Sequence, residues 1–439
     1  MKLPNRILIA VSMLVAGAAQ GGDLLTVYDL AMQQDPALRA AKQRLESERE
    51  KKPQAKAQLL PTIAINAGYQ VNNRDTLDSR IGTSDGEDSF NNRALEIRLN
   101  QPIYRRDFWI QLDQSDNEIA LAEANYAVAE LDLMARVINI YFNILAAQDN
   151  LTVSKAQTEA NNRQLDQSKQ RFEVGLIAIT DVHEAQAAYD QSRANEIEAE
   201  NFVDNAWEAL FAVIGPYPRN IAKLGEELPL SPPEPANMES WANSAVQQNY
   251  SVIAAMNTVE IQRKQIEVER SGHYPQLNLE ASYGSSRYSD LNYGSDRDDG
   301  VIGLSLSIPL YQGGGVSSRV RQSQYDFQAA QDELDRERRQ VNADVRNAYR
   351  AVISNISQVG ALKATMISSK SALESTQAGY EVGTRTLVDV LTVQTQMFDS
   401  TRNYLRSRYD YIINGLLLKQ RASILSKEDI AKVNGWLVE

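Results

Sequence analysis

The chain contains no cysteine among its 439 residues and only two histidines, His183 and His273. The missing cysteine excludes disulfides, thiolate nucleophiles, cysteine metal ligands and a lipid attached to an N-terminal cysteine. No HExxH, GxSxG or Walker sequence is present, and the glycines at 313–315 lack the lysine and spacing of a phosphate loop. Asp181 and His183 are two residues apart and would not share a helix face that could hold a metal. We therefore expect no enzyme activity, no cofactor and no metal site.

Long apolar runs are also missing. The main one covers residues 7–16, after Lys2 and Arg6 and before the small residues at 16–19, which is the layout of a secretory signal peptide. About ten residues are too few for a membrane-spanning helix, which needs roughly 20. We predict that residues 1–19 are a signal peptide cleaved near Ala18 or Ala19.

Positive charge is in deficit, with 45 basic and 57 acidic residues and a formal net charge of −12. Loss of Lys2 and Arg6 with the signal peptide would make the mature chain more acidic. This balance disfavours nucleic acid and anionic lipid as partners. An acidic aqueous path for cations or mixed solutes remains compatible with it.

Proline is absent between Pro102 and Pro216 and after Pro309, and Gly175 is the only glycine in residues 105–214. Such stretches permit very long helices, because proline and glycine are the residues that interrupt them. Residues 105–171 would form one helix of 67 residues, about 100 Å long. That length exceeds the diameter of an ordinary domain.

The apolar residues of this stretch follow heptad spacing along two seams. The first consists of Leu121, Ala124, Val128, Leu131, Ala135, Ile138, Phe142 and Leu145, and the second of Ala127, Met134, Val137, Tyr141, Ile144 and Leu151. The seams lie about 100° apart around the helix, so the helix should contact neighbours on two sides. This arrangement suits a helix in a ring better than a helix in a two-stranded coil.

The chain repeats itself once, with landmarks in the same order in both halves. Val174 and Gly175 recur as Val382 and Gly383, 208 positions later. Further landmarks recur at similar offsets: Pro61, Tyr69, Pro102, Tyr104 and Asp181 match Pro275, Tyr283, Pro309, Tyr311 and Asp389. We predict a first repeat over residues 20–215 and a second over 237–439, each with a helix, two strands, a long helix and a helix, and the second ending in a short tail. The linker, 216–236, holds six prolines.

Four segments alternate apolar with mostly polar or small residues, as strands do. They lie near residues 63–71, 95–99, 277–283 and 302–308. Each is roughly ten residues, enough to cross an outer membrane as a tilted strand with one lipid face and one aqueous face. The connections 72–92 and 285–300 are long and polar, like exterior loops.

A soluble antiparallel sheet would show the same alternation. The signal peptide and the very long helices favour the membrane interpretation. Four strands cannot close a barrel, which usually needs at least about eight, and open sheet edges are not tolerated in lipid. Several copies of the chain must then share one barrel.

Three segments resemble those of the TolC family of outer-membrane channels: QLDQSKQRFEVGLIAITDV, IPLYQGG and GYEVGTRTLVDV. The resemblance runs in register from about Leu24 to about Asp429. It implies a homotrimer whose chains each give four strands to one transmembrane β-barrel, with the helices continuing as a long coiled-coil barrel into the periplasm. It also implies a periplasmic adaptor and an inner-membrane transporter of the RND, ABC or MFS type as partners. A length check agrees, because helices over 23–56 and 181–214, placed end to end, would match the single long helix.

The resemblance also implies a gate where helices turn back at the periplasmic end. It places Thr180, Asp181, Tyr380 and Arg385 in constraining links: Tyr380 would donate to Asp181, and Arg385 would reach Thr180 and Asp181 of a neighbouring copy. Gln164 matches another link position. Its partner position holds Gln377 in place of a glutamate, so that link would be a neutral hydrogen bond.

Asp389 matches an acidic residue of the constriction, while the second acidic position is Thr392 here, which halves the expected carboxylate ring. From the residues alone, Thr180, Asp181 and Asp389 are better explained as N-caps of the returning helices, and capping and gating can coexist.

These features predict a mainly α protein that acts as a passive, gated outer-membrane conduit for drugs or secreted proteins within a tripartite efflux or type I secretion complex. A structural or adhesive trimeric coiled-coil surface protein is the alternative, and a soluble periplasmic enzyme is a more remote one.

Overall fold

A computed structural model of the chain describes residues 22–76, 86–216, 219–289 and 295–438. The predicted signal peptide lies outside these residues. The chain forms two bodies. The first contains the described parts of Met1–Arg39, Glu130–Ala242 and Asp344–Glu439, and the second those of Ala40–Ala129 and Asn243–Ala343.

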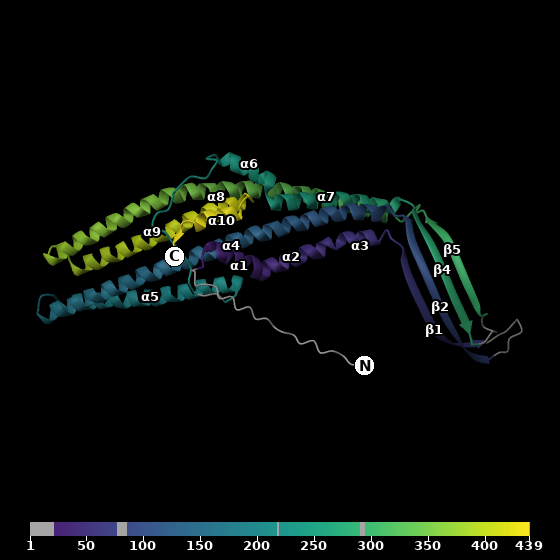
Figure 1. The fold of residues 1–439 in the computed structure, drawn as a ribbon, viewed down its shortest axis with the longest axis horizontal. Coiled ribbons are helices and arrows are strands. Elements are labelled where there is room, and N and C mark those ends of the chain that lie inside the picture. Colours follow the sequence, from purple (N-terminus) through teal and green to yellow (C-terminus); the bar gives the residue numbers. More distant parts are fainter. Residues whose placement is uncertain (1–21, 77–85, 217–218, 290–294, 439) are drawn as a thin grey trace, which may run out of the picture. The chain divides into compact units, whose positions relative to one another are not determined.

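The described residues are mainly helical (Figure 1). The helices are α1 (Leu24–Gln34), α2 (Pro36–Arg49), α3 (Lys51–Ala57), α4 (Arg106–Glu173), α5 (Ile179–Ile214), α6 (Met238–Gln248), α7 (Tyr250–Arg270), the 3-10 turn η1 (Ser271–His273), α8 (Gly315–Glu381), α9 (Leu387–Arg421) and α10 (Lys427–Asn434). The strands are β1 (Thr62–Thr76), β2 (Gly86–Tyr104), β3 (Lys223–Leu224), β4 (Gln276–Tyr288), β5 (Arg297–Ser307) and β6 (Leu437–Val438).

The predicted long helix is confirmed. It spans 68 residues as α4, and its counterpart α8 spans 67. Neither contains a proline, so the backbone hydrogen-bond ladder continues from end to end. Both predicted seams of α4 are buried in the first body, the first at Leu131, Ala135, Ile138, Phe142 and Leu145 and the second at Val137, Tyr141 and Ile144. The helix therefore packs on two sides there.

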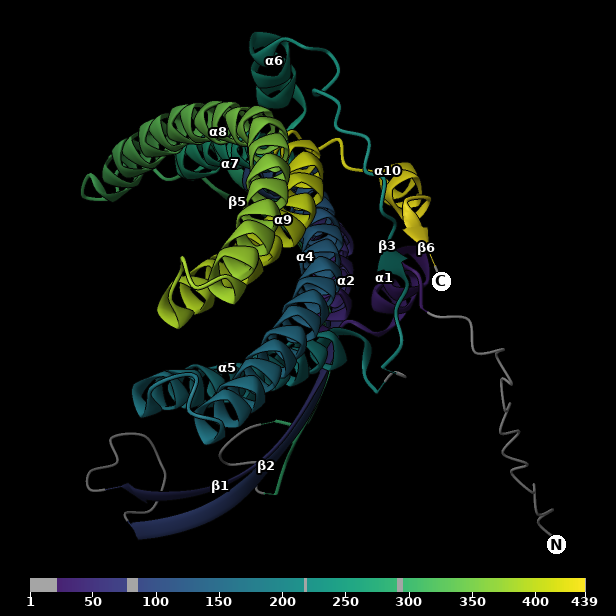
Figure 2. The same cartoon turned by 90° about the vertical axis from the view of Figure 1, so that its left-hand side faces the viewer.

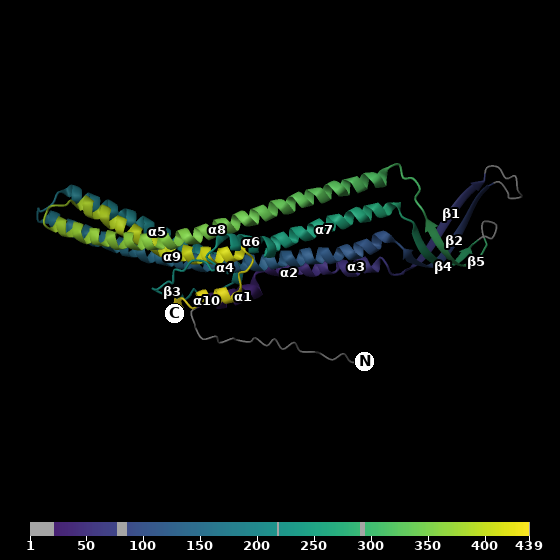
Figure 3. The same ribbon diagram turned by 90° about the horizontal axis from the view of Figure 1, so that it is seen from above.

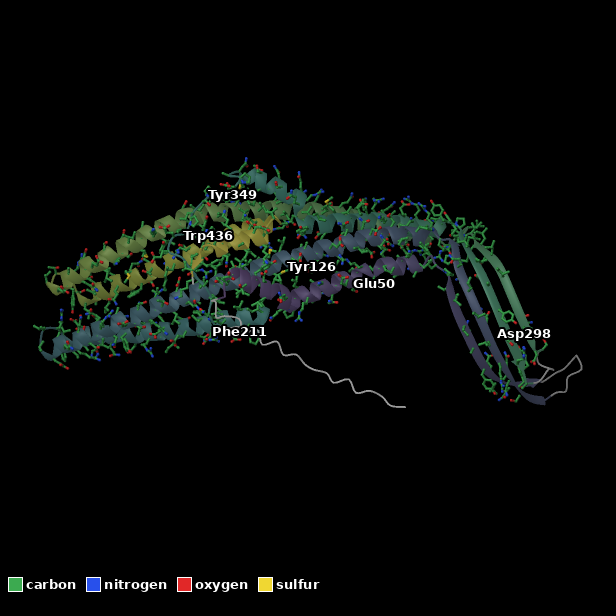
Figure 4. All side chains as sticks on the ribbon, in the orientation of Figure 1. Glu50, Tyr126, Phe211, Asp298, Tyr349 and Trp436 are labelled. Carbon is green, nitrogen blue, oxygen red and sulfur yellow. The ribbon has the colours of Figure 1, made fainter. Side chains whose placement is uncertain are left out.

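The expectation of one helix over residues 23–56 is wrong, because the segment is divided into α1, α2 and α3. Asp35 ends α1 with ψ 118°, and Pro36 begins α2, where its missing N–H costs no helical hydrogen bond. The buried Asp35 carboxylate accepts from Leu38 N at 2.8 Å, which caps the new helix. The second break lies at Glu50, labelled in Figure 4, because Pro53 cannot donate to the carbonyl one turn earlier.

The four long strands form one antiparallel sheet in the order β1-β2-β4-β5, so β2 and β4 join the two halves of the sequence. All four predicted strands are confirmed, but each strand in the structure is longer than its predicted segment. Residues 72–76 and 86–92, predicted as loop, pair in the β1–β2 ladder because backbone pairing does not require apolar side chains. Residues 77–85 and 290–294 of the predicted loops lie outside the described residues.

The two described ends of the chain meet in the first body. Helix α10 lies beside α1 (Figure 3), where Lys427 Nζ contacts Asp29 Oδ1 at 2.6 Å. Asn434 Nδ2 donates to Asp23 Oδ2 at 2.8 Å. The two-residue strands β3 and β6 pair antiparallel beside them. The predicted linker is thus attached to the C-terminal segment by backbone hydrogen bonds.

Candidate functional site at the hairpin turns

The turn between α4 and α5 follows from one glycine. Gly175 has φ +73°, a left-handed conformation that ends helices at low cost only for glycine. Leu176 N donates to Arg171 O at 2.9 Å, and Gly175 N donates to Phe172 O at 2.8 Å. These bonds satisfy carbonyls that the end of α4 would leave without partners. Figure 2 looks towards this turn and the α8–α9 turn.

The turn between α8 and α9 also has a glycine with positive φ, and a second glycine lies close to an arginine side chain. Gly383 has φ +80°, Gly383 N donates to Tyr380 O at 3.1 Å, and Thr384 N donates to Gly379 O at 2.8 Å. A Cβ atom on Gly379 would lie 2.8 Å from Cγ of Arg385, closer than real Cβ contacts come. Gly379 was not among the predicted site residues. Alignment of the repeats offered the signal, since the position 208 residues earlier holds the much larger Arg171.

The prediction that Thr180, Asp181 and Asp389 are N-caps is wrong for both α5 and α9. The N-cap of α9 is Thr386, and Asp389 is the third helical residue, whose Oδ2 accepts from Thr386 N at 2.9 Å in a capping box. The N-cap of α5 is Ala178, and neither Thr180 nor Asp181 holds that position. Asp and Thr are permitted at several positions of a first turn, so residue type alone misplaced the caps by up to three residues.

Asp389 therefore has a defined electrostatic environment. The backbone N–H and the hydroxyl of Thr386 donate to its carboxylate, and with the nearby charge of Arg385 they lower the pKa of Asp389 below its usual value. Thr392, at the second constriction position, is exposed on α9. One carboxylate oxygen of Asp389 is engaged in capping.

Tyr380 lies where the two hairpins meet. Its ring packs against a buried cluster formed by Leu165 of α4, Ala185 of α5 and Leu387 of α9. Cζ of Arg171 lies 5.1 Å from the ring centroid. Within the described chain the buried Tyr380 hydroxyl has no hydrogen-bond partner, so the predicted bond to Asp181 is not formed in this structure.

The remaining gate positions are found on the same helices. Asp181 lies in the first turn of α5, where its Oδ1 accepts from the Thr180 hydroxyl at 3.4 Å. Gln164 is half-buried on α4 and Gln377 is exposed on α8, and no hydrogen bond joins the two among the described residues. A link from Arg385 to a neighbouring copy stays a prediction.

A line of polar pairs that sequence reasoning missed joins α4 to α9. Gln394 Nε2 donates to Asn161 Oδ1 at 2.7 Å in a fully buried contact, and Arg402 Nη1 donates to Gln157 Oε1 at 3.0 Å. Burial and the adjacent Asp149 carboxylate, which accepts from the Tyr409 hydroxyl at 2.6 Å, raise the pKa of Tyr409. Tyr409 is thus a neutral donor at every physiological pH.

Helix α9 also holds residues 225–231 of the linker. The guanidinium of Arg408 donates to the carbonyls of Gly225 and Glu226. Ser231 N donates to the Tyr411 hydroxyl at 3.0 Å. Gly225 N in turn donates to the carbonyl of Trp436, labelled in Figure 4, at 3.0 Å. We call residues 225–231 the strap.

The described residues contain no group of three or more histidine, cysteine, aspartate or glutamate side chains placed to hold a metal ion. None of their helices combines the length and the apolar character needed to cross a bilayer.

The fold of the chain is shared by a solved outer-membrane channel. It superimposes on the Campylobacter jejuni CmeC outer membrane channel with a TM-score of 0.79 at 17% identity, covering 100% of this chain and 98% of that one.

Comparison of the amino-acid sequence identifies the family. The chain is 35% identical over 427 residues to outer membrane protein TolC of Vibrio cholerae, covering 96% of this chain and 95% of that protein. It is 28% identical to the proteases secretion protein PrtF of Dickeya chrysanthemi, covering 98% and 94%. The model of the outer membrane efflux protein family matches residues 27–216 and 241–420, and the chain belongs to that family. It is an outer-membrane channel protein for efflux or secretion that extends into the periplasm.

Proposed function

We propose that three copies of this chain assemble into a passive, gated duct in which a shared transmembrane β-barrel continues into a periplasmic helical tunnel. The observation that carries the proposal is the four-stranded sheet of the second body. It has one apolar face and one polar face, and no other described strand pairs with either of its edges. This combination is costly in water and incomplete in lipid unless further copies complete it.

The apolar face is continuous across the sheet. The register pairs Ile65 with Ile97, Ile97 with Tyr283, and Leu279 with Leu304, and directly paired residues point to the same face. Ile65 is 70% exposed and Leu304 is 69% exposed in the single chain. Soluble proteins rarely leave so wide an apolar surface uncovered, whereas the lipid face of a membrane strand requires one.

The opposite face suits an aqueous interior. Asn66 pairs with Glu96, Asn100 pairs with Glu280, and Arg98 Nη2 contacts Glu96 Oε2 at 3.2 Å. Strands β4 and β5 have 13 and 11 residues, enough to cross the hydrocarbon layer at a tilt, which takes about 9–11. At the loop end of the sheet, Arg287 Nη2 contacts Asp298 Oδ1, labelled in Figure 4, at 2.9 Å.

Closure requires other copies. Among the residues that the structure describes, β1 pairs only with β2 and β5 only with β4, so both edge strands offer unpaired backbone groups. Three copies in a ring would pair every edge and give twelve strands, above the minimum of about eight. The helices, with seams on two sides, would close into a ring below the barrel.

The same proposal places the gate at the hairpin turns, with Thr180, Asp181, Gln164, Gln377, Tyr380, Arg385 and Asp389 as its residues. The duct has no nucleotide site or catalytic group of its own in this proposal, so the energy comes from an inner-membrane transporter joined through a periplasmic adaptor. TolC and PrtF relatives support an efflux or secretion role. The signal peptide at 1–19, the repeats at 20–215 and 237–439, and the linker at 216–236 complete the proposed organisation.

Two adjacent residues on opposite faces of β1 test the barrel. Ile65→Lys puts a charge on the apolar face, at a cost of about 2–4 kcal/mol near the bilayer midplane, and should reduce the yield of detergent-extracted trimer and of conducting channels in planar bilayers. Asn66→Lys, the matched control, points to the polar face beside Glu96 and should assemble and conduct normally. Equal assembly of the two variants, or a monodisperse monomer for the unaltered chain, would refute the proposed barrel.

A further inference from the structure

A cavity of about 320 Å³ lies in the first body, where the predicted linker meets α9 and α10. Its lining includes Pro233 of the linker, Leu416 of α9 and Trp436, which follows α10 and is labelled in Figure 4. None of the proposed gate residues lines it. Small-molecule sites occupy about 300–1,000 Å³, so the cavity is large enough to hold a ligand.

Gly415 keeps this cavity open. It lies inside α9 and lines the cavity, and a Cβ atom added to it would meet nothing within 4 Å. Its φ is not positive and no neighbouring backbone comes close, so the fold does not require glycine at this position. Glycine disfavours a helix interior more than any residue except proline. The consequence of glycine here is a space beside α9 that a larger side chain would fill.

The buried side chains around the cavity, all within the described part of the chain, leave no polar group for a ligand. Trp241 Nε1 donates to Pro235 O at 2.9 Å. The Tyr411 hydroxyl accepts from Ser231 N at 3.0 Å and lies 3.1 Å from Ser231 O. A polar group inserted among these side chains would lose its bonds to water without replacement, so the inserted part of a ligand must be apolar. The other buried lining side chains are aliphatic: Val352, Ile412, Leu416, Leu418 and Val433.

The helical side of the lining carries a surplus of hydrogen-bond donors. Both oxygens of Asp429 are engaged, because Oδ1 accepts from Lys419 Nζ and Oδ2 accepts from Ser426 N at 3.2 Å. Lys419 keeps two N–H donors and the exposed Lys432 keeps three, since Lys432 has no ion pair among the described residues. Two lysines and one aspartate leave one positive charge in excess, which suits an anionic acceptor group.

Glu234 is the charged residue on the linker side of the lining. It is exposed and has no ion pair among the residues that the structure describes. Its carboxylate would repel a second negative charge on a ligand. The charges around the cavity therefore favour a single anionic group over a multiply charged one.

We propose that this cavity binds an amphipathic monocarboxylate, whose apolar body lies among the buried side chains beside Gly415 and whose carboxylate pairs with Lys432. The site is additional to the proposed duct, and binding at it does not depend on conduction. The class of ligand is a small molecule with one aromatic or branched aliphatic group and one carboxylate.

The probe is para-fluorophenylpropionate, and the corresponding amide is its uncharged counterpart. Fluorine NMR line broadening measures the binding of each to the purified full-length protein in an uncharged detergent, and the detergent alone gives the background. The unaltered chain should bind the carboxylate about two- to five-fold more tightly than the amide, the ratio expected of one exposed ion pair.

Four variants locate the site. Gly415→Leu fills the cavity and should abolish the binding of both probes. Gly360→Leu, at an equally open position on α8 outside this cavity, is the matched control and should bind both probes like the unaltered chain. Lys432→Gln should weaken carboxylate binding about two- to five-fold and leave amide binding unchanged, whereas Glu234→Gln should strengthen carboxylate binding.

The site is overturned if the unaltered chain binds neither probe above the detergent background, or if it binds the two probes equally. Undiminished binding in a folded Gly415→Leu variant would place the ligand elsewhere. If that variant does not fold, the two exposed charge variants decide, because equal carboxylate affinities of Lys432→Gln and Glu234→Gln would remove the proposed carboxylate site.

Discussion

The attachment of the strap to α9 leads to a prediction with a definite magnitude. Arg408 is only 8% exposed, and its guanidinium donates to the carbonyls of Gly225 and Glu226. Arg408→Met keeps most of the side-chain length and removes both charge-assisted bonds. Both bonds come from the same nitrogen, Nη2, and count as one charge-assisted contact worth about 1.5–3 kcal/mol net. Local opening of residues 225–231 should therefore become about 10- to 150-fold more frequent.

Hydrogen exchange of the peptide covering residues 225–231, followed by mass spectrometry, measures that opening. Arg406→Met is the matched control, because Arg406 lies on the same helix but is half exposed and pairs with Asp410 at 2.9 Å. It should leave exchange of the strap unchanged, since exposed ion pairs contribute little. Unaltered exchange in Arg408→Met, or equal effects of the two variants, would refute the reasoning that the buried guanidinium holds the strap.

Two further predictions concern the α8–α9 turn. Gly379→Ala should displace Arg385 and lower the stability of the turn by about 1–3 kcal/mol, whereas Gly360→Ala, in an open position of the same helix, should raise stability by about 0.5–1 kcal/mol. Thermal unfolding of the two variants compares them, and a loss of stability in both would contradict the steric argument. The lowered pKa of Asp389 means that its capping of α9 is complete above about pH 4 and is lost as the pH falls further. Exchange at residues 387–390 should therefore accelerate on acidification in the unaltered chain relative to Asp389→Asn, and parallel profiles would disprove the coupling.

The site shows where sequence reasoning succeeds and where it stops. Gly175 and Gly383 predicted both turns because a left-handed backbone is a local requirement that glycine meets at low cost. The ring of Tyr380 lies against Arg171, and its hydroxyl has no hydrogen-bond partner among the described residues, so the link to Asp181 that the resemblance implies stays a prediction. The partner of a side chain depends on how two helices are rotated about their own axes. A shift of one residue turns a helix face by about 100°, which no local pattern records.

The sequence by itself determined the elements of this protein: the two proline-free helices, the four alternating strands, the glycine turns and the membership of the family. The helices, strands and turns depend on constraints within a few residues, such as a missing N–H donor, a missing Cβ or a repeat of apolar positions. The tertiary structure alone decided the pairing of β2 with β4, the buried Asn161–Gln394 contact, the strap on Arg408 and the Arg171–Tyr380 junction. These contacts join residues about 180 or more positions apart, and only the packing of complete helices and strands brings such residues within a few ångströms of each other.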